Sequence, residues 1–569
     1  MKAKSYTKFL AMMLAVVMMF GVFSINGYAA ITYNENATNS YYKLISQRNW
    51  QLAPGIEETE VVINNTSGTR RQVVHTVNVD MNNPYNRVIP GYKNMDPFSG
   101  NYGVEVTSQQ ALNAEKLGYG NVVAATNAML SWYDSAYYKS HPEYAGEPLG
   151  WNVCNGQYYE NSLGALGNMS TSYGTLIIRY DVHPETGEKR PDNVPKVEMV
   201  NSGKYFKVVG TNVDGSARYG LDESKREEFS WIENAISAWA WLVKPDANGN
   251  PVAQNNVNDH TSSLASRTFI GIKADGTFVV SVSDGDQAPY STGFTMGEMS
   301  DYMIRMGCIA ALNCDGGGST TFCSQRPGED LKVNCSLSDG GERPTTNTIL
   351  IISDAPADGE LSTATLSSDY DYYTPGSSVE FGVIGIDASG AKVEIPDDVE
   401  WKIAEEGMGT IENGVFTSNG TEGTVTAQMV YKNNIVGERV IHIATPDAIS
   451  LNQPVVTIPF GKTAKIPIKA TVNGGLHEIG LGADDVSFVT DNPALGAFSG
   501  MSFTAVEQAN APENISSTVT ATLNIGDNPS VQFELKLGRA SEVLFDFEGG
   551  QSDIDEWNII DNRNGTVWD

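Results

Sequence analysis

The sequence contains few basic residues for its length. Of its 569 residues, 37 are Lys or Arg and 68 are Asp or Glu, so the formal net charge is −31. Binding to nucleic acid or to an anionic surface depends on clustered Lys and Arg that displace counterions. The composition therefore excludes nucleic acid as a general partner, and any anionic ligand must be held by a few local arginines.

Histidine and cysteine are also rare. The six histidines are spread along the chain and give no pattern for a histidine metal cage or a Ser-His triad. Five cysteines are too few for a disulfide scaffold, and their odd number leaves at least one unpaired or paired between chains. Four of them lie between 308 and 335, where a zinc site is the alternative, but they lack the two close pairs of a zinc ribbon. We expect no metal and no cofactor, and a disulfide between Cys323 and Cys335 across a Pro-Gly turn.

Beyond the N-terminus, no stretch is apolar enough to span a bilayer. Residues 1–30 combine three early lysines, an apolar run from Phe9 to about Phe23, and small residues at Gly27 and Ala29. This is the pattern of a signal peptide cleaved after Ala29 or Ala30, with an uncleaved anchor as the alternative. The sequence predicts a secreted, extracellular protein, and cell-wall association is a further expectation.

The chain is too long for one ordinary domain and, at 41% hydrophobic and 18% charged residues, too apolar for disorder. A Pro-, Asp- and Gly-rich stretch near 353–360 indicates a linker after a first domain at 31–355. Residues 360–445 show short strands and turns in the spacing of an Ig-like β-sandwich. A second β-sandwich-like module is expected at 446–540, and 541–569 reads as the start of a truncated β-module.

The first domain is predicted to be α+β, with mixed sheets and helices, followed by the Ig-like β-sandwich modules. A helix followed by a buried strand is expected twice, at 108–130 and at 295–318. In the second, Thr295 and Glu298 form a capping box, and Met299, Met303 and Met306 share a helix face that is expected to lie in the core. Residues 266–286 predict a hairpin with an Asp-Gly turn. A further helix is expected within 224–243. Residues 31–50 read as a polar leader, so that the first folded unit opens at 73–81.

One motif, "NCDGGGSTTFCS" at 313–324, sets a carboxylate beside three consecutive glycines. Such a run is entropically unfavourable and packs nothing, so it is usually tolerated only where the backbone turns sharply or approaches something closely. Asp315 follows the predicted strand at 308–314. We therefore expect a small polar group to lie against Asp315.

Three motifs occur in a fixed order: "RTFIGI" at 267–272, "DGGGST" at 315–320 and "GGERPTTN" at 340–347. The stretch that carries them, roughly 50 to 355, resembles the phosphodiester glycosidase family, and the order makes the resemblance specific. The resemblance implies that the first domain is catalytic. Two departures stand out: only Asn127 carries over from an Asn-Gly-Gly motif, and Asp286 stands where many relatives have a phosphate-facing arginine.

The resemblance and the chemistry together point to Asp315 and Glu342 as the catalytic pair. A phosphate leaving group has a second pKa of roughly 6, so its protonation is less urgent than in ordinary glycoside hydrolysis. Two-carboxylate glycosidases use one group on water or the anomeric carbon and the other on the leaving side. The sequence leaves the two roles open. Asp315 could instead cap a turn, and Glu342 could form a structural ion pair with Arg343.

The remaining candidates would bind substrate. Guanidinium groups fork onto phosphate oxygens, which favours Arg343 and Arg267 for the phosphate, although Arg267 could be a cation on a strand surface. Backbone N–H groups of the glycine run could also meet an oxygen, and no histidine stands in the motif to activate a hydroxyl. Asn127 and Asp284 could hold sugar hydroxyls or satisfy turn backbone. The predicted binding set is Asn127, Arg267, Asp284, Gly316, Gly317, Gly318, Ser319 and Arg343.

The sequence thus predicts a secreted glycosidase that hydrolyses a sugar-1-phosphodiester at the anomeric C–O bond in cell-wall or exopolysaccharide-type glycans. Its partners would be a phosphorylated glycan and, through the β-modules, cell-wall polysaccharide. One alternative is a phosphodiesterase that cleaves P–O, a chemistry that usually recruits metal ions. The other is a non-catalytic glycan-binding protein, which would have lost the Asp and the Glu.

Overall fold

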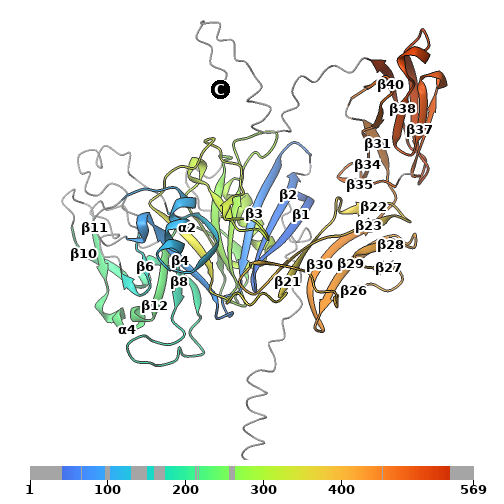
Figure 1. Cartoon of the computed structure of the whole chain (residues 1–569). Helices are drawn as coiled ribbons and strands as arrows, with labels where there is room; N and C mark the ends of the chain where they lie inside the picture. The colour runs from blue at the N-terminus through green and yellow to red at the C-terminus, as the bar shows by residue number, and fades with distance from the viewer. Residues whose placement is uncertain are drawn as a thin grey trace, which may run out of the picture.

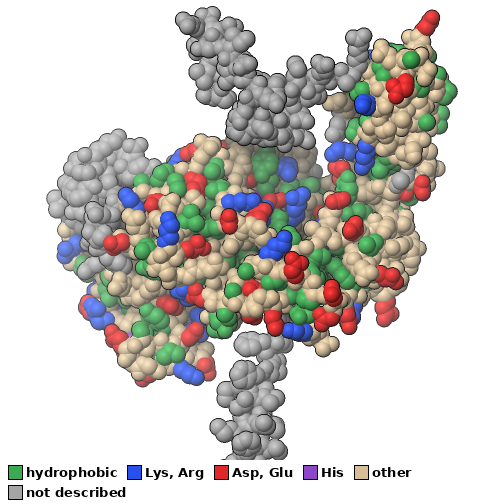
Figure 2. All heavy atoms as spheres, in the orientation of Figure 1, with side chains coloured by type: hydrophobic (Ala, Val, Ile, Leu, Met, Phe, Trp, Pro, Cys, Tyr) green, Lys and Arg blue, Asp and Glu red, His purple; other side chains and the backbone are tan. Residues whose placement is uncertain are grey.

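The computed structural model describes residues 42–65, 67–96, 103–129, 150–158, 173–211, 215, 217–254, 263–451, 453–482 and 484–538. The predicted signal peptide (1–30) and the predicted partial module (541–569) lie outside the described residues. No helix of the described part is long and apolar enough to cross a membrane. Figure 2 shows Asp and Glu side chains spread over the visible face, with basic side chains among them.

Antiparallel sheets make up the first domain, shown at the left and centre of Figure 1. The largest has the order β1 (Tyr42–Ala53), β2 (Ile56–Asn65), β3 (Arg71–Val79), β16 (Phe278–Ser283), β15 (Arg267–Lys273), β17 (Cys308–Asn313), β13 (Ala240–Pro245), β14 (Pro251–Ala253). A second has the order β19 (Lys332–Val333), β18 (Phe322–Ser324), β5 (Asn121–Asn127), β20 (Asn347–Ser353), β4 (Asn86–Tyr92). A third has the order β7 (Gln157–Tyr158), β6 (Val153–Cys154), β12 (Ile232–Ser237), β8 (Gly174–Arg179), β9 (Val197–Asn201), and β10 (Phe206–Thr211) pairs with β11 (Ala217–Leu221).

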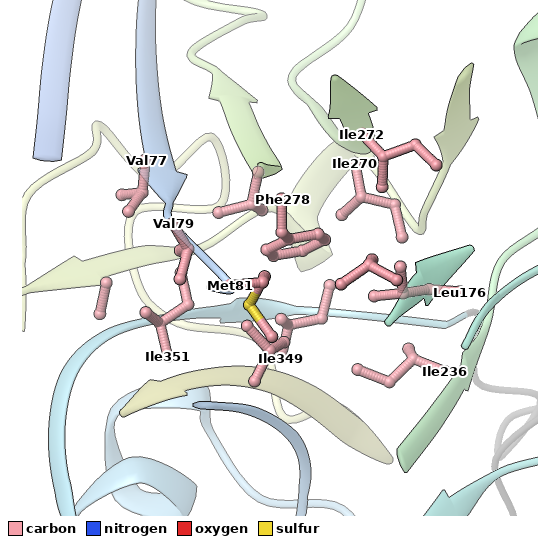
Figure 3. Packing of buried hydrophobic residues seen from close by; sticks show 14 of the residues in the cluster. Val77, Val79, Met81, Leu176, Ile236, Ile270, Ile272, Phe278, Ile349 and Ile351 are labelled. Atoms are coloured by element: carbon pink, nitrogen blue, oxygen red, sulfur yellow. The ribbon is translucent and has the colours of Figure 1, made fainter. Parts of the chain in front are cut away.

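The main core lies where these sheets face one another. Period-two alternation along β3 and β15 turns one set of apolar side chains toward the second and third sheets. Figure 3 shows these residues meeting: Val77, Val79, Met81, Leu176, Ile236, Ile270, Ile272, Phe278, Ile349 and Ile351. The opposite face of the largest sheet is covered by α5 (Met296–Arg305), whose buried methionines pack on Phe269 and Val279. The largest sheet is therefore buried on both faces.

The prediction of an α+β first domain is wrong, because the described part is β-rich. It contains three short α-helices, α2 (Thr107–Lys116), α4 (Arg226–Ser230) and α5, besides the 3-10 turns η1 (Lys93–Met95), η4 (Ser202–Lys204), η5 (Glu223–Lys225) and η6 (Gly317–Ser319). The helix–strand units are real, but each strand that follows a helix pairs only with antiparallel neighbours. The two helix–strand predictions were right locally, but the α+β fold class inferred from them overestimated the helix content of the domain.

Local predictions near the site are confirmed. The helix α2 leads into β5, and α5 carries the capping box, with the Thr295 hydroxyl accepting from the Glu298 N–H and the Glu298 carboxylate accepting from the Thr295 N–H. Strand β17 follows α5, and β15 and β16 form the predicted hairpin. The predicted methionine face of α5 is buried.

Two other predictions are wrong. Within 224–243 only Arg226–Ser230 is α-helical, and β12 and β13 occupy most of the rest. Strand β12 lies inside its sheet between β6 and β8 and its last four residues are all buried, so its apolar run lacks the alternation that marks a strand. The predicted polar leader at 31–50 is also partly strand, because β1 begins at Tyr42 and pairs with β2.

Residues 363–538 form the β-modules expected from sequence. Their strands are β21 (Thr363–Ser367), β22 (Tyr372–Tyr373), β23 (Ser378–Glu380), β24 (Gly382–Ile386), β25 (Lys392–Val393), β26 (Glu400–Ile403), β27 (Gly409–Glu412), β28 (Val415–Ser418), β29 (Gly423–Tyr431), β30 (Asn434–Ile443), β31 (Ala448–Leu451), β32 (Val455–Pro459), β33 (Thr463–Lys465), β34 (Ile468–Val472), β35 (His477–Gly480), β36 (Val486–Thr490), β37 (Gly496–Ser499), β38 (Ser502–Ala505), β39 (Ser516–Leu523) and β40 (Ser530–Gly538), with turns η7 (Pro493–Leu495) and η8 (Gln508–Asn510). One sheet, β26-β29-β30-β22-β35-β34-β31, takes strands from both sides of residue 446. The boundaries at 355 and 446 stay predictions.

A fragment of residues 31–355 is expected to fold alone and to keep the turnover of the whole chain. All four sheets described in the first domain, the β10–β11 pair included, are built from strands before residue 354, and the two largest core clusters consist of residues of this domain alone. Links to the modules include partly buried hydrogen bonds, such as the one between His477 Nδ1 and Ile45 O at 3.0 Å. Calorimetry and an activity assay test this. An insoluble or inactive fragment beside an active whole chain would show that the modules complete the site.

Candidate active site

One edge of the largest sheet gathers the sequence motifs. Strand β15 is antiparallel to both neighbours, so β16 and β17 run in the same direction on either side of it. The C-terminal ends of β16 and β17 therefore meet the N-terminal end of β15. This places Asp284, Arg267 and Asp315 at the same edge, although the three lie far apart in the sequence.

Asp315 is held by its backbone and partly enclosed. Its N–H donates to Ala128 O at 2.8 Å, and its carbonyl accepts from Asn127 Nδ2 at 2.8 Å. Its carboxylate accepts the Gly316 N–H at 3.0 Å. Burial raises the pKa of Asp315 above its ordinary value, while hydrogen bonds from Ser319 and Gly316 and the charge of Arg343 act in the opposite direction. The side chain therefore keeps its proton to a higher pH than an exposed aspartate.

The three glycines are required by their neighbours in the fold. Gly317 has φ of 63°, the left-handed region that glycine tolerates best, and its N–H donates to Ser266 O at 2.8 Å. A Cβ on Gly316 would lie 3.0 Å from the same carbonyl oxygen. A Cβ on Gly318 would overlap the Arg343 guanidinium and the Asp339 carboxylate. The close approach predicted from the glycine run is thus made by Ser266 and by the Arg343 side chain.

The segment between β19 and β20 carries Glu342 and Arg343, and it brings Arg343 against Gly318 in the loop of Asp315. Glu342 Oε1 accepts the Ser108 N–H at 3.2 Å, and its other oxygen accepts the Ser108 hydroxyl. Ser108 lies in the first turn of α2, where the helix dipole favours an anion. Arg343 instead pairs with Asp339, its Nη2 lying 2.6 Å from Oδ2, and about two fifths of each side chain is exposed. The two neighbours therefore have separate partners.

Arg267 is buried rather than displayed on the strand surface. Its Nε donates to Phe294 O at 3.2 Å and its Nη2 to Ser263 O at 2.9 Å. Burial lowers the pKa of the guanidinium, and the charge of Asp286 opposes this. Asp286 is itself exposed and accepts the Ser266 N–H at 3.2 Å. The position expected to carry a second phosphate-facing arginine thus carries an exposed carboxylate, whose charge acts on Arg267.

Asn127 and Asp284 lie behind the site and are fully buried. Asn127 Oδ1 accepts the Thr268 hydroxyl at 2.7 Å and the Thr321 N–H at 3.1 Å, while its amide nitrogen holds Asp315. Asp284 accepts the Tyr290 hydroxyl at 2.9 Å and the Ser336 N–H at 3.0 Å. The polar atoms of both side chains are engaged with the protein, which fits support of the surrounding loops better than contact with sugar hydroxyls.

The cysteines form no disulfide, so the predicted bridge is not present: all five are free thiols. Cys335 Sγ accepts the Phe322 N–H at 3.1 Å, and Cys323 Sγ lies 3.9 Å from Glu342 Oε1. Burial raises the pKa of both thiols. Within the described ranges, no group of three His, Cys, Asp or Glu side chains is placed to hold a metal ion.

Several partners of the site were missed from the sequence. Ser108 carried a local signal, since it lies at the start of a predicted helix, and Asp339 stands at i−4 from Arg343 in the same turn segment. Ser266 and His75 carried none, because their neighbours come from strands that are distant in the sequence. The contacts of Ser266 and His75 form only when distant strands pair, so they could not be predicted from neighbouring residues.

Comparison with known proteins points to one family. Residues 153–352 match the phosphodiester glycosidase family. The chain is 34% identical over 119 residues to an uncharacterized SPbeta prophage-derived protein, YomE, of Bacillus subtilis, a match that covers 21% of this chain and 17% of that protein. The zebrafish N-acetylglucosamine-1-phosphodiester alpha-N-acetylglucosaminidase catalytic domain covers 54% of this chain and 89% of its own at 16% identity, with a TM-score of 0.36. A putative exported protein of Burkholderia pseudomallei covers 57% and 99% at 12% identity, with a TM-score of 0.35.

Proposed function

Because residues 153–352 match the phosphodiester glycosidase family and so confirm the resemblance carried by the three motifs, we propose that this chain hydrolyses a sugar-1-phosphodiester at the anomeric C–O bond. The observation that supports this most is the meeting of Asp315 with Arg267 and Arg343 at one sheet edge. The matched segment contains all three residues, and Glu342 as well.

The arginines suit a phosphodiester anion. Arg343 is 39% exposed and pairs with Asp339 through one oxygen of that carboxylate. A phosphate could therefore also accept hydrogen bonds from the Arg343 guanidinium. Arg267 holds a fixed position through its hydrogen bonds to Phe294 and Ser263. In a chain with a net charge of −31, such local cations supply the attraction that the protein as a whole does not.

The two carboxyl groups have different surroundings, which supports different roles. Burial raises the pKa of Asp315, so this carboxyl keeps its proton to a higher pH than an exposed aspartate, which suits proton donation to the leaving phosphate oxygen. Glu342 receives two hydrogen bonds at a helix N-terminus, which stabilise an anion. We assign Glu342 to activation of water or attack at the anomeric carbon.

The substrate class we propose is a phosphorylated glycan outside the cell, of the cell-wall or exopolysaccharide type. A leader-like N-terminus in the sequence and the β-modules at 363–538 support an extracellular protein that also contacts wall polysaccharide. The particular sugar would be set by loops next to the site.

Hydrolysis in heavy-oxygen water tests the bond that breaks. We expect the label in the sugar hemiacetal, since water or an enzyme carboxylate attacks carbon and the phosphate leaves with its bridging oxygen. Mass spectrometry of both products, with a sample left in unlabelled water as the control, gives the answer. Label in the phosphate would identify a phosphodiesterase, and binding without turnover across sugar-1-phosphodiesters would favour a non-catalytic glycan-binding protein.

A further inference from the structure

A buried polar cluster lies beneath the candidate site, between the largest and second sheets. His75 on β3 is 1% exposed, its ring stacks on Phe322 of β18 at 5.3 Å, and neither ring nitrogen has a hydrogen-bond partner within the described residues. Its Nε2 lies 3.7 Å from Asp284 Oδ2, and its Nδ1 lies 3.9 Å from Glu60 Oε2. These distances are too long for hydrogen bonds and suit close ion pairs.

The charges around His75 are mostly negative. Glu58 and Glu60 approach from β2, Asp284 from the end of β16, and the Cys335 thiol lies near Asp284. Arg326 balances part of this charge, with its Nη2 2.6 Å from Glu58 Oε1 and 3.6 Å from Glu60 Oε2. Burial alone would lower the pKa of His75, but Asp284, Glu58 and Glu60 together raise it above its ordinary value. The cluster therefore keeps the imidazolium to a higher pH than an exposed histidine would.

Asp284 connects the cluster to the segment that carries Glu342 and Arg343. Its Oδ1 accepts the Ser336 N–H at 3.0 Å, and the Ser336 hydroxyl donates to Gln287 Oε1 at 2.5 Å. Two residues further, the Ser338 hydroxyl lies 3.2 Å from the Ser266 hydroxyl, which donates to Gly317 O at 2.9 Å. The segment 334–343 is thus fixed at its start by Asp284 and in its middle by the loop of Asp315.

We propose that His75 and Asp284 are positioning residues, whose buried ion pair anchors the segment 334–343 and thereby holds Glu342 and Arg343 at the sheet edge. The inference rests on the proposed function for its effect on turnover, but not for its effect on the segment. Neither side chain touches substrate in this arrangement. The pair acts through the Ser336 N–H, which donates to the Asp284 carboxylate that the ion pair holds in place.

The test uses Asp284→Asn and His75→Gln in the whole chain. Asparagine keeps an acceptor oxygen for Ser336 and removes the charge, whereas glutamine removes the imidazolium. Both variants should lower kcat on a sugar-1-phosphodiester by about a hundredfold, since small misplacements far from the chemistry have effects of that size. Hydrogen exchange of backbone amides in 334–343 should accelerate in both. His183→Gln is the matched control, since His183 is also buried but bonds Ser230 beside the third sheet, and it should change neither.

The wild-type chain gives a second test that does not depend on a variant folding. As pH rises through the raised pKa of His75, the imidazolium is lost and Asp284 faces Glu58 and Glu60 without it. We therefore expect exchange in 334–343 to rise beyond its intrinsic pH dependence on the alkaline side, and His75→Gln to lack this rise. Exchange is the deciding readout here, because kcat also falls when Asp315 loses its proton. Two results would overturn the inference: both variants keeping the kcat and the exchange rates of the wild type, or exchange in 334–343 of the wild type showing no rise on the alkaline side. If the wild type turns over no sugar-1-phosphodiester, the proposed function fails, and exchange still decides the anchoring.

Discussion

Asp315→Asn should lower turnover of a sugar-1-phosphodiester by at least about a hundredfold, at the low end of general acid–base contributions. Asparagine keeps the size of the side chain and its contact with the Gly316 N–H, so the backbone of the glycine run should stay in place. What is lost is the ionisable carboxyl group, whose pKa is raised by burial. Steady-state kinetics on a sugar-1-phosphodiester measures the effect.

The same substitution should leave thermal stability unchanged or slightly higher at neutral pH. A carboxyl with a raised pKa in the folded state contributes stability at low pH, and this is lost as pH rises through the folded pKa. Asparagine does not ionise, so the variant does not lose this stability as the pH rises. Asp354→Asn, at an aspartate that pairs with Arg87 after β20, is the matched control and should keep full turnover. Intact turnover in Asp315→Asn would remove Asp315 from the chemistry, even with the family match standing.

Gly318→Ala should raise KM by about tenfold, with a smaller change in kcat. The new methyl group overlaps the guanidinium of Arg343 and the carboxylate of Asp339, so the pair must move. A charge-assisted hydrogen bond to phosphate contributes about 1.5–3 kcal/mol, and 1.4 kcal/mol corresponds to about a tenfold change in affinity. KM for the phosphodiester and Ki for inorganic phosphate both report the loss.

Gly317→Ala separates this effect from strain in the turn. Gly317 has a left-handed φ but open space around its Cβ position, so alanine there should cost about 1–2 kcal/mol of stability and leave Arg343 in place. Thermal unfolding should therefore change more in Gly317→Ala, and KM more in Gly318→Ala. Combining Gly318→Ala with Arg343→Gln should add little to either single effect, because both act on one contact. Additive losses would contradict a phosphate role for Arg343.

Much of the local structure near the site could be predicted from the sequence. The capping box of α5, its methionine face and the Asp-Gly hairpin of β15 and β16 depend on neighbouring residues, and all formed as expected. The ordered motifs also identified the family before any geometry was known. By contrast, only Arg226–Ser230 of the stretch 224–243 is α-helical, because β12 pairs with β6 and β8, which are distant in the sequence.

The chemistry available could be read from the residues alone: Asp315, Glu342 and two arginines stand in ordered motifs within a strongly acidic chain. The tertiary structure decided how each is used. It buried Asn127 and Asp284 behind the site, gave Glu342 a partner in Ser108, and placed His75 among three carboxylates. The physical reason is that strand pairing joins residues of any separation, so burial and charge at this sheet edge depend on contacts that no local pattern encodes.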